Sequence, residues 1–223
     1  MKKLHRQLIA ANFALLTALK MFYLVTILSF VVVIPFAIGM RYFNRMPQAM
    51  SVIVLLCGAW SITEILMFSL RVQGINNAFL SYALTAVEVY LFSGFYFHTT
   101  GNRYIRMIAF SSIPLVVFDY LVFGTPLNTF SLVVEYILIT GMAVYLFIQI
   151  TRRKASADFF LINLTLLFYF LSSFPYFLAW EWLRTTNMDL LGLLAGIHLY
   201  VHAICYLIIA FTLWKSQLSY SAR

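Results

Sequence analysis

Residues 127–150 read LNTFSLVVEYILITGMAVYLFIQI, an apolar run in which Glu135 is the single acidic or basic residue. Crossing the hydrocarbon core of a bilayer takes about 20 predominantly apolar residues in a helix. This stretch therefore predicts a transmembrane helix. A carboxyl group inside such a helix is costly, so Glu135 also predicts a site that supplies a partner or water.

The same pattern recurs along the chain, which is 63% hydrophobic and only 10% charged. Together these features predict an all-α polytopic membrane protein, a seven-transmembrane-helix bundle that forms one domain over residues 21–214. Residues 215–223 are expected to form a short cytoplasmic tail. Besides 127–150, the predicted spans are 21–40, 49–70, 77–98, 104–123, 157–180 and 190–214.

The first twenty residues are basic at their start and then apolar, which somewhat resembles a secretory signal peptide. No good small-x-small cleavage site follows. We therefore expect residues 1–20 to be an N-terminal amphipathic, interfacial helix or an extension of the first span.

The net charge of +8 comes from basic residues at the ends of the predicted spans. The positive-inside rule explains this placement, so a nucleic-acid partner is not expected. The asymmetry predicts a bacterial inner-membrane protein with its N-terminus outside and its C-terminus in the cytoplasm, although the basic N-terminal tail disagrees with that orientation. The residues on the predicted cytoplasmic side are Arg41, Arg45, Arg103, Arg106, Arg152, Arg153, Lys154, Lys215 and Arg223, against Arg71 and Arg184 on the other side.

Polar side chains inside the spans recur three or four residues apart, which places them on common helix faces. One shared polar cavity in the outer half of the membrane would keep all these faces out of lipid. Hydrogen bonds that simply join helices are the structural alternative for any one residue. The residues expected in the cavity are Glu64, Glu88, Glu135 and His198, with Asn76, Asn77 and Asn128 at its mouth.

Several segments carry a resemblance to a known family. They are SITE at 61–64, NNAFLSY at 76–82 with VE at 87–88, LNTFSLVVE at 127–135, FFLINLTLLFYFLSSFPYF at 159–177 and IH at 197–198. With these motifs the chain resembles a largely uncharacterised family of seven-helix membrane proteins of Bacteroidota. Related seven-helix modules resemble the membrane sensor portions of bacterial histidine kinases.

The resemblance implies a non-enzymatic sensor or accessory subunit, whose cavity binds a ligand or partner and which needs no cofactor. The chain is expected to carry no kinase or DNA-binding output of its own. Its expected partners are therefore membrane lipid and another membrane protein, or further copies of itself.

A second resemblance concerns metal chemistry. The segment HLYVH places His198 and His202 at the i, i+4 spacing that lets two imidazoles hold one zinc ion. It is similar to the HxxxH motif of the seven-helix hydrolase superfamily of alkaline ceramidases and adiponectin receptors, and SGFYFH at 93–98 loosely resembles another stretch of that superfamily. The resemblance implies a zinc-dependent intramembrane hydrolase as an alternative. A third ligand would come from Glu64, Glu88, Asp119 or Glu135.

Other functions are limited by what the sequence lacks. No lysine lies within a late span to form a retinal Schiff base, and no phosphate-binding glycine loop, serine nucleophile elbow or CxxC pair occurs. Cys57 and Cys205 lie in mid-span and are expected to be core residues without a disulfide. A small-solute transporter stays as a further alternative, although no internal repeat supports it.

Overall fold

The computed structural model describes residues 26–123, 129–156 and 159–221, and within these ranges the regular structure is entirely helical. Six of the helices are long and apolar enough to cross a membrane. The chain is thus a helical protein of the membrane-embedded type. The helices are α2 (Val33–Arg41), α3 (Gln48–Val72), α4 (Ala78–Thr100), α5 (Arg103–Phe123), α6 (Thr129–Thr151), α7 (Phe160–Thr186) and α8 (Met188–Ser221), with a short 3-10 helix η1 (Phe43–Arg45) between α2 and α3.

The predicted spans agree with the six long helices to within a few residues at most ends. Two ends differ more: α7 continues to Thr186, and α8 continues to Ser221, so most of the expected tail is helical. Polar residues at a helix end extend the hydrogen-bonded backbone without changing the apolar run, so hydropathy alone does not locate the last turns.

The first predicted span, 21–40, corresponds to the shorter apolar helical stretch Thr26–Arg41. Its first part, and the expected interfacial segment 1–20, lie outside the described residues, so the count of seven spans stays a prediction. A turn at residues 31–32 interrupts this stretch. Pro35 explains the interruption, because a proline ring clashes with the carbonyl four residues earlier, here that of Val31.

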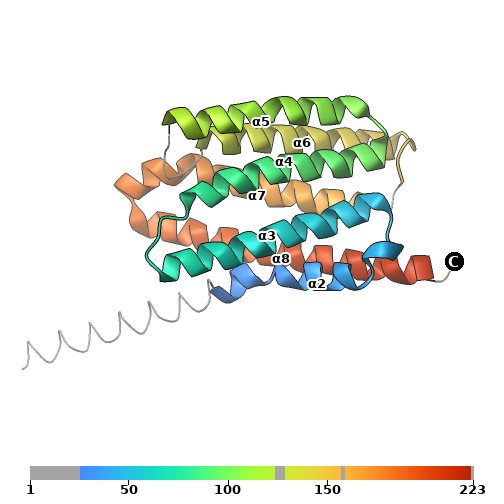
Figure 1. The fold of residues 1–223 in the computed structure, drawn as a ribbon, viewed down its shortest axis with the longest axis horizontal. Helices are drawn as coiled ribbons and strands as arrows, with labels where there is room; N and C mark the ends of the chain where they lie inside the picture. Colours follow the sequence, from blue (N-terminus) through green and yellow to red (C-terminus); the bar gives the residue numbers. More distant parts are fainter. Residues whose placement is uncertain (1–25, 124–128, 157–158, 222–223) are drawn as a thin grey trace, which may run out of the picture.

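Tight turns follow α3 and α4, and glycine is required at both of them. Gly74 follows α3 with φ of 70°, and Gly101 ends α4 with φ of 71°. Both are left-handed conformations that cost a glycine little and most other residues more. These turns reverse the chain within a few residues, so consecutive helices run antiparallel (Figure 1).

The helices close into a ring with one helix outside it. In order around the ring, α3 packs against α4, α4 against α6, α6 against α7, α7 against α8, α8 against α2, and α2 against α3. Helix α5 packs only on α4 and α6 among its main contacts, and Figure 1 shows it at the edge of the bundle. The ring therefore encloses an interior to which α5 contributes little.

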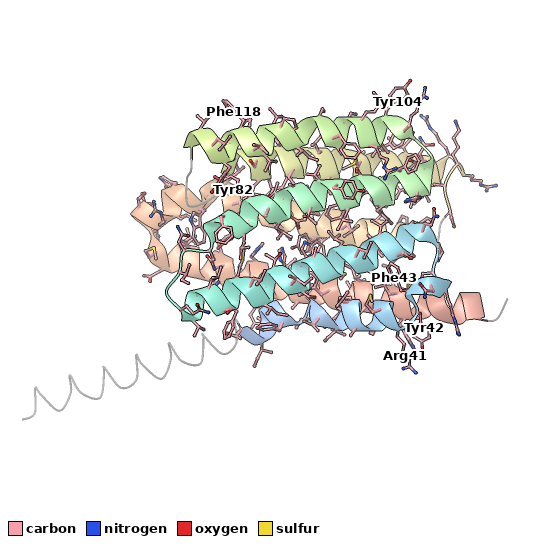
Figure 2. The ribbon with its side chains drawn as sticks, viewed as in Figure 1. Arg41, Tyr42, Phe43, Tyr82, Tyr104 and Phe118 are labelled. Atoms are coloured by element: carbon pink, nitrogen blue, oxygen red, sulfur yellow. The ribbon has the colours of Figure 1, made fainter. Side chains whose placement is uncertain are left out.

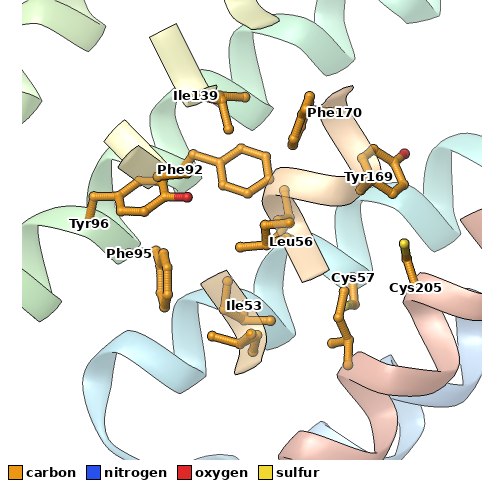
Figure 3. Close-up of a cluster of buried hydrophobic side chains, with 14 of the residues drawn as sticks. Ile53, Leu56, Cys57, Phe92, Phe95, Tyr96, Ile139, Tyr169, Phe170 and Cys205 are labelled. Atoms are coloured by element: carbon orange, nitrogen blue, oxygen red, sulfur yellow. The ribbon is translucent and has the colours of Figure 1, made fainter. Parts of the chain in front are cut away.

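The part of the interior nearer the C-terminal end of α8 is a packed apolar core. Aromatic rings from α4 meet aliphatic side chains from α3 and α6, among them Phe92, Phe95, Ile53, Leu56 and Ile139 (Figure 3). Cys57 and Cys205 are buried beside this core as free thiols. Burial of each large side chain contributes roughly 1.5–3 kcal/mol in a soluble protein, whereas between membrane helices the gain comes from close packing.

One buried amide joins three helices of the ring. Asn163 in α7 is fully buried and donates through its Nδ2 to the carbonyl of Ala143 in α6 at 2.9 Å. Its Oδ1 accepts a hydrogen bond from the hydroxyl of Tyr96 in α4 at 3.1 Å. With both ends of the amide satisfied, Asn163 has the structural role of a bridge between helices.

The basic residues gather at one end of the bundle. Figure 2 shows Arg41 and Tyr104 at the end where α2, α4 and α6 finish, and α8 finishes there too. We call this the cation-rich end. The other end, where α3 and α7 finish, carries Arg71 and Arg184.

Candidate ligand site: a polar cavity inside the ring

A cavity of about 280 Å³ lies inside the ring, and we call it the polar cavity. Five helices line it: α3, α4, α6, α7 and α8. Its ionisable lining consists of three carboxyl groups and two imidazoles, and the rest is hydroxyl, aromatic and aliphatic. The polar and aromatic lining residues are Trp60, Thr63, Glu64, Ser81, Thr85, Glu88, Glu135, Tyr136, Tyr169, Phe170, Phe177, His198, His202 and Tyr206.

The polar cavity lies in the half of the bundle away from the cation-rich end. Its lining residues come from the first half of α4, the beginning of α6 and the second half of α3. The structure brings Glu64, Glu88, Glu135, His198 and His202 together around this one space. Matching helical faces from distant parts of the sequence therefore meet at similar depth.

Glu88 and Glu135 form the centre of the polar cavity. Their carboxyl groups face each other between α4 and α6, and Thr85 lies beside Glu135. The indole N–H of Trp60, in α3, donates a short hydrogen bond to Oε1 of Glu88. The exposed fraction is 6% for Glu88 and 1% for Glu135, so neither carboxyl group is solvated from outside.

Glu135 is the least satisfied of these groups. Despite the nearby carboxyl and hydroxyl, neither of its carboxyl oxygens has a partner at hydrogen-bonding geometry. In the described part of the chain, three buried side-chain polar atoms lack a partner, and the third is Nδ1 of His198. All three belong to residues that line the polar cavity. A buried polar atom left unpaired costs about 1–3 kcal/mol, so the cavity is where this structure leaves hydrogen-bonding capacity unused.

The two histidines lie one above the other on α8. Their ring centroids are 3.8 Å apart, and Nε2 of His202 is 2.7 Å from the hydroxyl of Ser173 in α7. The His202 ring also stacks on Tyr169 with centroids 3.8 Å apart, and the His198 ring on Tyr176 at 4.7 Å. Both imidazoles are thus held by aromatic neighbours, and Nδ1 of His198 has no hydrogen-bond partner.

Glu64 lies nearer the rim of the polar cavity. It is partly exposed, and its carboxyl group lies beside the hydroxyl of Ser29. Arg71, two turns further along α3, attracts it electrostatically. This third carboxyl group is therefore better satisfied than Glu135.

Aromatic rings form much of the remaining wall, and the sequence analysis did not assign Trp60 or Tyr169 to the site. Trp60 stacks on Tyr169 with centroids 5.2 Å apart and planes at 17°, and Tyr206 contacts both rings. The hydroxyls of Tyr169 and Tyr206 are 3.2 Å apart. A signal was present: Trp60 precedes Glu64 by four residues and Tyr206 follows His202 by four, which are same-face spacings.

The structure does not place every predicted residue in the polar cavity. Asn77 begins α4 and donates to the carbonyl of Met67 at 3.1 Å, and neither it nor the exposed Asn76 lines the cavity. Asn128 lies outside the described residues. Asp119, in α5, accepts hydrogen bonds from the backbone N–H and the hydroxyl of Ser131, at 3.0 and 2.6 Å. Because Ser131 is in the first turn of α6, Asp119 stabilises a helix N-terminus and is not a candidate third metal ligand.

A second hollow, of about 270 Å³, lies between α5 and α6. Its wall is mostly aliphatic, with Asn102, Tyr104 and Tyr145 as its polar members, and contains no carboxyl group or imidazole. Ligand sites usually combine apolar walls with a few convergent polar groups, and ionisable side chains inside a membrane mark functional sites, so the polar cavity is the stronger candidate site.

Comparisons of the chain with protein-family models, with curated proteins and with solved structures gave no match. The function of the polar cavity is therefore argued from its own residues.

Proposed function

We propose that this protein is a seven-helix membrane sensor or accessory subunit that binds a ligand in the polar cavity and acts on a partner protein. The observation that carries the proposal is the set of three unpaired buried polar atoms on Glu135 and His198, two residues that line one space of about 280 Å³. A structural hydrogen-bond network satisfies its own groups, as Asn163 does. A ligand site leaves some of its polar groups without an internal partner, and the ligand then pairs with them.

The proposed arrangement in the membrane follows from the charges at the two ends. With the cation-rich end in the cytoplasm, the polar cavity lies in the outer half of a bacterial inner membrane. The ligand would then reach the cavity from outside, and the partner would contact the lipid-facing or cytoplasmic surface.

The test is purification from native membranes in mild detergent, followed by mass spectrometry of whatever co-purifies. We expect wild type to carry a small molecule or a partner protein that is reduced in the Glu88→Gln, Glu135→Gln double variant, because the amide pair changes the charge and donors of the cavity. Asp119→Asn is the matched control, since it alters a buried acidic residue away from the cavity. A double variant with the same co-purifying molecules and full function in a deletion strain would contradict the proposal.

Zinc-dependent hydrolysis is the second candidate, favoured by the adjacent rings of His198 and His202 and by the unpaired Nδ1 of His198. Within the described ranges, no group of three histidine, cysteine or acidic side chains is arranged to hold a metal ion. A third ligand such as Glu135 would therefore have to move. Elemental analysis decides: a hydrolase requires about one zinc per chain, lost in His198→Ala and His202→Ala. Purified wild type without zinc, also after incubation with the ion, eliminates this candidate.

A further inference from the structure

The unpaired polar atoms of the polar cavity can act as hydrogen-bond acceptors. When ionised, a carboxyl group only accepts hydrogen bonds, and neither carboxyl oxygen of Glu135 has a donor. Glu88 receives the indole N–H of Trp60 on one oxygen. Nδ1 of His198 can accept a further hydrogen bond when the ring is in the tautomer that leaves this nitrogen unprotonated. A ligand that donates hydrogen bonds therefore suits these acceptors, and a ligand with several N–H groups suits them best.

The charge of the cavity lining favours a ligand that carries positive charge. Among the described residues, the cavity is lined by three carboxyl groups and by no lysine or arginine. Arg71 interacts with Glu64 from near the rim, which leaves Glu88 and Glu135 without a cationic side chain as a partner. An anionic ligand would meet repulsion from both.

The aromatic wall adds a second, independent attraction for a cation. The aromatic side chains come from four helices of the ring, one from each, and are Trp60 in α3, Tyr136 in α6, Tyr169 in α7 and Tyr206 in α8. Aromatic rings carry negative charge density on their faces and bind ammonium groups when water is excluded. Their carbon atoms also provide a surface for an apolar ligand body.

The volume sets the size of the ligand. Since one water molecule occupies about 30 Å³ of liquid, a space of about 280 Å³ holds roughly nine waters. That is room for a small molecule. A bare metal ion would leave most of the aromatic wall without contact.

We propose that the polar cavity binds a small organic cation, a protonated primary amine with a short apolar body. Its ammonium group donates to the free carboxyl oxygens of Glu135, with Glu88 beside it, and its apolar body lies against Trp60 and Tyr169. This inference rests on the proposed function, because it takes the polar cavity to be a ligand site.

The experiment uses three probes of similar shape and different charge: benzylamine, benzyl alcohol and benzoate. Binding of each labelled probe to the full chain in nanodiscs of neutral lipid is measured by equilibrium dialysis at pH 7. We expect benzylamine to bind saturably at about one per chain, and the neutral and anionic probes to bind at least about tenfold more weakly, because only the ammonium group forms charge-assisted hydrogen bonds.

Two variants locate the binding. Glu135→Gln keeps the side-chain size and removes the charge, and we expect it to weaken benzylamine binding about tenfold or more. Glu135→Asp keeps the charge and should retain the preference for benzylamine over benzyl alcohol. Asp119→Asn serves as the control with unchanged binding. Thermal unfolding of each variant in the same nanodiscs shows that a loss of binding is not a loss of fold.

Three outcomes overturn the inference. Benzylamine binding that is equal in wild type and Glu135→Gln, or absent, excludes the amine. Tighter binding of benzyl alcohol or benzoate, lost when Tyr206 is changed to Ala, also overturns it and leaves the proposed ligand site standing for another class of ligand. Benzylamine binding that disappears with a metal chelator would belong to a bound metal ion instead. When no probe binds and nothing cavity-dependent co-purifies, the proposed function fails as well.

Discussion

The indole nitrogen of Trp60 explains how a carboxyl group is accommodated inside an apolar ring of helices. It donates to Oε1 of Glu88 from the neighbouring helix, and its ring stacks on Tyr169. One side chain therefore supplies both a hydrogen bond and part of the cavity wall. Glu135 has no equivalent donor, and this difference between two adjacent carboxyl groups is the basis of the proposed ligand chemistry.

The Trp60 hydrogen bond can be measured with a double-mutant cycle. Trp60→Phe keeps an aromatic ring and removes the donor, which leaves a buried carboxyl oxygen unpaired, so we expect a loss of about 1–3 kcal/mol in the free energy of unfolding. In a Glu88→Met background there is no acceptor to leave unpaired, and the loss should fall to about 0.5 kcal/mol or less. Unfolding in detergent followed by circular dichroism gives both values. An equal loss in both backgrounds would assign the effect to ring packing.

Among the helices, the contact of α2 with α3 depends on small residues. A Cβ added at Gly39 would overlap the side chain of Val54, and one at Gly58 would lie 2.8 Å from Cε2 of Phe36. Close approach of two backbones through glycine is a common way for membrane helices to pack. These glycines therefore set how near α2 lies to α3, and hence how the ring closes.

Gly39→Ala and Gly141→Ala form a matched pair that tests this contact. Alanine is favoured over glycine inside a helix by about 1 kcal/mol, so Gly141→Ala, which has nothing within 4 Å of the added Cβ, should be neutral or slightly stabilising. Gly39→Ala forces α2 away from Val54 and should be less stable than Gly141→Ala by about 1–3 kcal/mol. Adding Val54→Ala should recover part of the difference. Equal stability of the two glycine variants would mean that α2 is free to shift.

At the scale of the whole molecule, the two ends of the bundle differ in charge, and this predicts its orientation in the membrane. Asn44 lies in the exposed connection at the cation-rich end, and Gln73 lies in an exposed turn at the opposite end. The native cysteines, Cys57 and Cys205, are buried and should react little with a polar reagent. A new cysteine at either exposed position therefore reports which side of the membrane it faces.

We expect a membrane-impermeant maleimide added to intact cells to label Gln73→Cys and not Asn44→Cys. Asn44→Cys should become labelled once the membrane is permeabilised, which serves as the control for its reactivity. The reverse pattern would place the polar cavity in the cytoplasmic half of the membrane and would change the side from which a ligand arrives.

Much of the fold could be predicted from local sequence because an apolar run long enough to cross the bilayer has few alternatives to a helix. The placement of Glu64, Glu88 and His198 on polar faces was equally local, since a spacing of three or four residues sets which side chains share a helix face. Local sequence could not separate Asp119 from these residues, because Asp119 is also an acidic residue inside an apolar run. Its partner, the N-terminus of α6, became known only from the packing of α5.

What the sequence by itself determined was the chain's helical, membrane-embedded character and the face of each helix that avoids lipid, because both depend on neighbours within a few residues. The tertiary structure decided that α5 lies outside the ring, that Glu135 meets Glu88, and that Trp60 and Tyr169 complete the wall of the cavity. These features depend on which helices pack together, and helix packing depends on surfaces that lie far apart in the sequence.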